Sequence, residues 1–119
     1  DGFYKKAKIS QARVDYEKDK NTYQQTRNQL MFQVEQAKMN LEMKQQNLEN
    51  QKKNKALAQT IYETSKIKFD EGVGSSFELI QAQTDQTQAE ISYSNALYEV
   101  IVAQIDLQTA LGTSQPNTK

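Results

Sequence analysis

The long absence of glycine and proline is the strongest constraint on how this chain can fold. Neither residue occurs between Lys8 and Lys68, where Gln, Lys, Glu, Ala, Leu and Met dominate. Most of these residues favour helix. The segment Gly72-Val73-Gly74-Ser75-Ser76 interrupts the pattern, and a second stretch without Gly or Pro extends from Ser75 to Leu111. We therefore predict an all-α fold, a long antiparallel two-helix coiled-coil hairpin.

The expected boundaries divide the chain into a linker, two helices joined by a turn, and a disordered tail, at residues 1–6, 7–71, 72–75, 76–112 and 113–119. Gly72 can take the left-handed conformation that ends a helix. Ser75, followed three residues later by Glu78, has capping-box spacing. Gly112 is expected to end the second helix. At ~1.5 Å per residue the helices would span roughly 95 Å and 54 Å, so the first extends beyond its partner.

Composition excludes several classes of function. The chain has 119 residues, one small domain at most, and its 15 basic residues balance 15 acidic ones. This balance gives no electrostatic case for binding nucleic acid or anionic lipid. Without Cys or His there is no thiol nucleophile, no histidine base and no thiolate or imidazole metal ligand. No apolar run approaches the length of a membrane-spanning helix. The chain begins Asp1-Gly2-Phe3, and we expect it to be a piece of a longer protein.

The second helix carries two stripes at 3-4 spacing. One, here called the isoleucine seam, comprises Phe77, Ile80, Thr84, Thr87, Ile91, Ser94, Tyr98, Ile101 and Ile105. The other, here called the alanine seam, comprises Leu79, Ala82, Gln86, Ala89, Tyr93, Ala96, Val100, Ala103, Leu107 and Ala110. The seams lie on nearly opposite sides of the helix, ~150° apart. A helix with two seams indicates a neighbour on each side, as in a closed cylinder of helices.

The first helix carries one such stripe, which is polar at several positions. It comprises Ile9, Ala12, Tyr16, Asp19, Tyr23, Thr26, Leu30, Val34, Ala37, Leu41, Lys44, Leu48, Gln51, Lys55, Ala58, Tyr62, Ser65 and Phe69. We interpret polar residues such as Lys44, Gln51 and Lys55 as a mark of packing around an aqueous space. A loose, poorly specified coiled coil is the alternative.

Residues Tyr62 to Gly112 read Tyr-x6-Phe-x2-Gly-x4-Phe-x2-Ile-x-Ala-Gln, followed by Ala89, Tyr93, Ala96, Ala103, Leu107 and Leu111-Gly112. This pattern resembles the last long helical hairpin of the TolC family of outer-membrane efflux proteins, and the opening Asp1-Gly2-Phe3 resembles the exit of that family's second pair of barrel strands. The resemblance implies the periplasmic hairpin of the second repeat in a homotrimeric α-barrel of Gram-negative bacteria. It implies a passive efflux duct without enzymatic activity or cofactor, whose partners are a periplasmic adaptor and, through it, an inner-membrane pump.

The resemblance also implies functional residues. The adaptor-binding tip aligns with Gly72, Val73, Gly74 and Ser75, although Gly72 could also be only a helix C-cap. Two acidic residues that ring the periplasmic aperture align with Glu78 and Gln81, so only Glu78 keeps the charge. The capping box with Ser75 is the competing role for Glu78. The family's tyrosine and arginine latch aligns with Phe69 and Gly74, which cannot form it; Asp70, Glu71 or Lys66 could replace it.

Two other functions fit a helical hairpin. A periplasmic adaptor also contains a long antiparallel coiled coil, but its tip usually carries a basic residue with Leu-Ser, and Glu71 to Ser76 contains no such group. A structural coiled-coil scaffold would need only one seam on each helix, and the alanine seam argues against it. An enzyme is the weakest hypothesis, because the chain offers no nucleophile–base pair.

Overall fold

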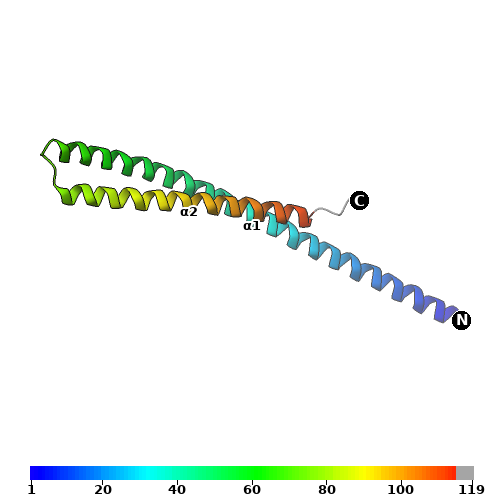
Figure 1. Cartoon of the computed structure of the whole chain (residues 1–119). Coiled ribbons are helices and arrows are strands. Elements are labelled where there is room, and N and C mark those ends of the chain that lie inside the picture. The colour runs from blue at the N-terminus through cyan, green and yellow to red at the C-terminus, as the bar shows by residue number, and fades with distance from the viewer. Residues whose placement is uncertain (115–119) are drawn as a thin grey trace.

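The computed structural model describes residues 1–114 as two helices that form a hairpin (Figure 1). Helix α1 is Gly2–Asp70 and helix α2 is Ser76–Ser114. The chain measures 106 × 26 × 14 Å along its principal axes. At ~1.5 Å per residue the 69 residues of α1 account for almost the whole length. The predicted long two-helix hairpin is therefore confirmed.

The alanine seam is the face of α2 that packs on α1. Every member of this seam is buried or half-buried, whereas every member of the isoleucine seam is exposed. The most covered residues of α2 are Ala82, Ala96, Val100 and Ala103, and Ala103 is only 1% exposed. Small side chains let two helix backbones approach closely. The contact is therefore narrow, and the larger apolar side chains of α2 face away from α1.

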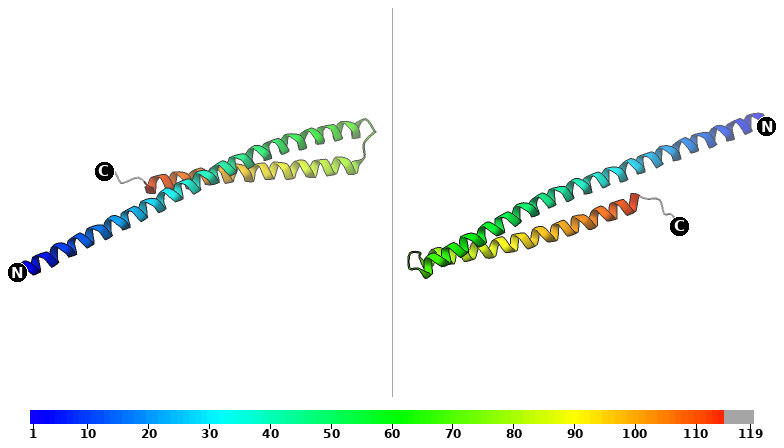
Figure 2. Two further views of the ribbon diagram at one scale, coloured as in Figure 1. Left: turned by 180° about the vertical axis from the view of Figure 1, so that it is seen from behind. Right: turned by 90° about the horizontal axis from the view of Figure 1, so that it is seen from above.

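The predicted seam of α1 is confirmed where α2 lies beside it. All its members from Leu30 to Ser65 are buried or half-buried, and Val34 is the most covered, at 8% exposure. Asn40 and Asn47 are also half-buried, although they lie outside the predicted seam. The two helices remain side by side from the tip to the end of α2 in both views of Figure 2.

The polar seam residues of α1 have partners across the hairpin, which replaces their interpretation as the lining of an aqueous space. The Lys44 ammonium lies 3.3 Å from the Glu99 carboxylate. The Lys55 ammonium lies 4.6 Å from the centre of the Tyr93 ring, a cation–π contact. Gln51 donates a hydrogen bond of 3.3 Å to Asn47. These contacts join specific levels of the two helices and so favour one register.

The first 29 residues extend past the end of α2 (Figures 1 and 2). Residues 2–29 of α1 are here called the N-terminal arm. All of them are exposed, including the seam members Ile9, Tyr16 and Tyr23. The arm thus presents the apolar stripe of a coiled coil with no helix of residues 1–114 against it.

Both outer ends differ from the sequence-based boundaries. Residues 2–6, expected as a linker, belong to α1, and the Lys5 N–H donates to the Asp1 C=O at 3.1 Å. Nothing in Phe3–Lys6 opposes helix. The prediction that Gly112 ends the second helix is wrong, because α2 continues through Thr113 and Ser114. A single glycine weakens a helix without breaking it. The remainder of the predicted tail, residues 115–119, lies outside the described residues.

Among residues 1–114, neither helix has a window apolar enough to cross a membrane.

The seam assignment predicts opposite outcomes for two neighbouring substitutions. Ala103→Leu would force a larger side chain between the helices and should destabilise the hairpin by about 1–3 kcal/mol. Gln104→Leu adds a comparable side chain at the adjacent, exposed position and should change stability by less than about 0.5 kcal/mol. Thermal unfolding followed by circular dichroism measures both effects. Equal effects would contradict the assignment.

Candidate functional site

The tip of the hairpin is a closed turn built on Gly72. Its φ of +80° is the only positive φ in residues 1–114. The Gly72 N–H donates to the Phe69 C=O at 3.0 Å, and the Val73 N–H donates to the Lys68 C=O at 2.9 Å. These two bonds form a Schellman motif, which satisfies carbonyls that a helix otherwise leaves unpaired. Gly72 therefore acts as the predicted C-cap, while a role in docking remains open.

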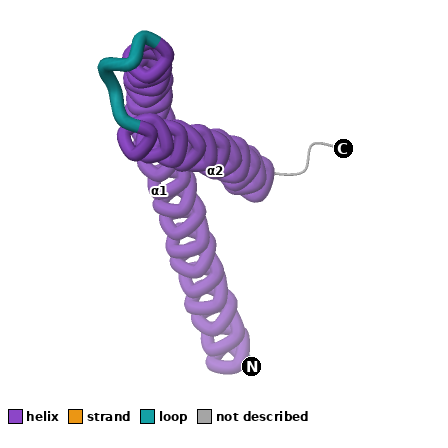
Figure 3. Tube along the Cα trace, turned by 60° about the vertical axis from the view of Figure 1, so that its left-hand side comes forward, coloured by secondary structure: helices purple, strands orange, loops and turns teal. Residues whose placement is uncertain are grey.

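The second glycine of the turn lies against the end of α1. The Gly74 N–H donates to the Lys68 C=O at 3.0 Å. A Cβ at position 74 would lie 2.9 Å from Lys68 Cβ and 3.1 Å from the Phe69 nitrogen. Side chains other than hydrogen are thus excluded by contact rather than by φ. The two glycines have different roles, and together they draw the loop tightly onto the helix end (Figure 3).

The tip leaves Val73 as its most prominent side chain. Val73 is 76% exposed, and it is flanked by the two glycines. Ser75 then begins α2 by accepting a hydrogen bond of 3.1 Å from the Glu78 N–H through its hydroxyl oxygen. A single apolar side chain on a bare backbone loop therefore forms the end of the hairpin.

Only one half of the predicted capping box is formed. The Glu78 carboxylate makes no hydrogen bond to Ser75 N–H and no ion pair among the described residues. The Glu78 main chain serves the cap, and its side chain is left unpartnered. The two roles considered for Glu78 are therefore separable, because they use different atoms of the residue.

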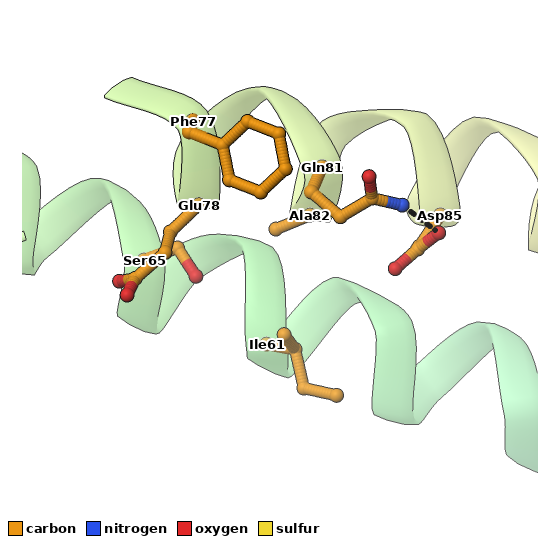
Figure 4. A pocket seen from close by; sticks show the side chains of 7 residues that line it. All are labelled: Ile61, Ser65, Phe77, Glu78, Gln81, Ala82 and Asp85. Carbon is orange, nitrogen blue, oxygen red and sulfur yellow. Dashed lines mark hydrogen bonds between the residues drawn. The ribbon is translucent and has the colours of Figure 1, made fainter. Parts of the chain in front are cut away.

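Glu78 and Gln81 come together in a shallow hollow between the helices, of about 260 Å³ (Figure 4). The hollow is lined by Ile61, Ser65, Phe77, Glu78, Gln81, Ala82 and Asp85. The Gln81 amide donates to an Asp85 carboxylate oxygen at 3.0 Å. Asp85 thus places a second carboxylate one turn beyond Gln81. The sequence analysis missed this residue, although the Gln–Asp spacing of four was a sufficient signal.

No latch is visible at the tip. Within residues 1–114, Lys66, Asp70 and Glu71 form no ion pair, and Phe69 is partly exposed. No group of three potential metal-ligating side chains occurs in the same part of the chain.

The close approach at Gly74 predicts a local effect of a small substitution. Gly74→Ala would press a methyl group against Lys68 and Phe69 and should destabilise the hairpin by about 1–2 kcal/mol. Gly112→Ala is the matched control, since Gly112 is helical and nothing lies within 4 Å of its Cβ position. It should be neutral or stabilising by up to about 1 kcal/mol. Urea unfolding of both variants tests the pair; a Gly74→Ala variant as stable as the parent chain would contradict the contact.

Comparison with known proteins places the chain in a family. The family model described as "Outer membrane efflux protein" matches residues 1–113. No curated protein and no solved structure gives a match. The match covers both helices, the tip and the N-terminal arm. The chain therefore belongs to the outer membrane efflux protein family.

Proposed function

We propose that this hairpin is a wall segment of the periplasmic α-barrel of an outer-membrane efflux duct. In this proposal the full-length protein is a homotrimer that passes substrates out of a Gram-negative cell. The segment performs no chemistry. An inner-membrane pump supplies the energy and reaches the duct through a periplasmic adaptor that docks at the hairpin tip.

The isoleucine seam is the observation that carries this proposal. It lies on the side of α2 opposite α1, and Phe77, Ile80 and Ile105 are each more than half exposed. A freestanding two-helix coiled coil needs one apolar seam on each helix. A second seam opposite the first suits a helix with neighbours on both sides. Within a cylinder of hairpins, each α2 meets such a neighbour.

The tip geometry supports docking at Gly72, Val73, Gly74 and Ser75. A loop without bulky side chains allows a partner helix to approach its main chain. Val73 offers an apolar contact at the centre of that surface. The Schellman motif holds the loop in one conformation, so a partner would meet a preformed surface rather than order a flexible one.

Glu78 and Asp85 are the proposed acidic residues of the aperture. They lie on the same hollow at the tip end of α2, and neither carboxylate forms an ion pair among the described residues. Gln81 would act by orienting Asp85 through its amide. Three copies of this pair around a threefold axis would form a negative collar that favours cations.

Cross-linking in intact cells tests the docking role. Val73→Cys in the full-length parent would place a thiol at the tip, since this chain has no native Cys. A bifunctional reagent should then capture a periplasmic adaptor.

Glu49→Cys is the matched control, because Glu49 is exposed on α1 far from the tip. It should not capture the adaptor. Capture at Glu49→Cys but not at Val73→Cys, or no adaptor from either, would remove the support for docking at the turn and favour a scaffold.

A further inference from the structure

The N-terminal arm carries a regular row of basic side chains. Lys6, Arg13, Lys20 and Arg27 are each seven residues apart and are here called the basic stripe. All four are exposed, and none forms an ion pair within residues 1–114. Residues seven apart share one flank of a coiled-coil helix. The basic stripe therefore borders the exposed seam of Ile9, Tyr16 and Tyr23 along the whole arm.

Helix α2 carries the opposite charge at the same period. It contains no Lys or Arg. Glu78, Asp85, Glu99 and Asp106, here called the acidic stripe, follow a seven-residue repeat in which Ser92 fills the remaining position. At ~100° per residue the stripe lies between the alanine seam and the isoleucine seam. It therefore borders an exposed apolar face, as the basic stripe does.

We propose that the arm is a docking surface for α2 of a second copy of this chain. The two surfaces match in chemistry, since each joins an exposed apolar seam to a row of charge, and the charges are opposite. They also match in period, because both rows repeat every seven residues. Registry of this kind is what flanking charges set in coiled coils. This inference does not depend on the proposed duct.

A two-fold dimer satisfies both copies at once. If the tips point in opposite directions, each arm runs parallel to α2 of the other copy. A shift of 79 positions then places Lys6 beside Asp85, Lys20 beside Glu99 and Arg27 beside Asp106, with Arg13 beside Ser92. The two α1 helices overlap over most of their length in this register. The dimer would therefore be about 110 Å long, close to the length of one chain.

Two acids of the stripe already have contacts within their own chain. Glu99 pairs with Lys44, and Asp85 accepts from Gln81. Both groups keep exposed surface, and a carboxylate can accept from more than one donor. Asp106 has no partner among the described residues. We expect Asp106 and Asp85 to contribute more to recognition than Glu99.

Charge reversal tests the proposal on the 119-residue chain. Sedimentation equilibrium at low salt should give a dimer, and raising the salt from about 50 to 500 mM should weaken it roughly tenfold or more, because exposed ion pairs are screened. Lys6→Glu with Arg27→Glu should give a monomer, and so should Asp85→Lys with Asp106→Lys. The chain with all four substitutions should dimerise again, since each pair is restored with reversed sign.

The controls separate recognition from folding and from net charge. Lys18→Glu with Lys53→Glu changes the net charge equally at exposed positions outside the stripes and should leave the dimer intact. Circular dichroism should show the same helicity in every variant. Small-angle scattering of the dimer should give a maximum dimension near that of one chain.

Several results would overturn the proposal. These are a parent chain that is monomeric at low salt, reversed variants that still dimerise, a fourfold variant that stays monomeric while fully helical, and an oligomer larger than a dimer. A dimer nearly twice as long as one chain would exclude the reciprocal arrangement. None of these results bears on adaptor capture at Val73→Cys, so the two proposals can fail separately.

Discussion

The close approach of α2 to α1 through alanine determines most of what this chain presents to its surroundings. Ala82, Ala96 and Ala103 are nearly fully covered, yet a methyl group covers little area and contributes little to burial. The hairpin therefore places its small residues inside and leaves larger ones outside. The isoleucine seam, the seam of the N-terminal arm and the side chain of Val73 all remain available for contact as a result.

Polar contacts supply the specificity that alanine cannot. A seam of small residues slides easily, because one methyl group resembles the next. The Lys44–Glu99 ion pair and the Lys55–Tyr93 contact join fixed levels of the two helices. The tip fixes the same register independently, since the Schellman motif and the Ser75 cap allow no slack between Asp70 and Ser76. Register is thus specified at the tip and again along the hairpin.

The sequence was sufficient for the parts of the fold that depend on local chemistry. Spacing identified both seams of α2, the packed seam of α1 from Leu30 to Ser65, and the cap at Ser75. It could not reveal why Lys44 and Lys55 occupy seam positions, because their partners come from the other helix and depend on register. The end at Gly112 was wrong because glycine permits a helix stop without requiring one. At the site, Asp85 was missed because attention rested on Gln81 alone.

The central claim is that α2 faces α1 with its alanines and the exterior with its isoleucines. Thiol labelling measures this most directly, since the chain has no Cys of its own and cysteine is close to alanine in size. At high dilution, Ala103→Cys should react with a thiol reagent far more slowly than Ile101→Cys, because position 103 is covered and position 101 is exposed. Equal rates, or a protected Ile101→Cys beside a reactive Ala103→Cys, would contradict the account.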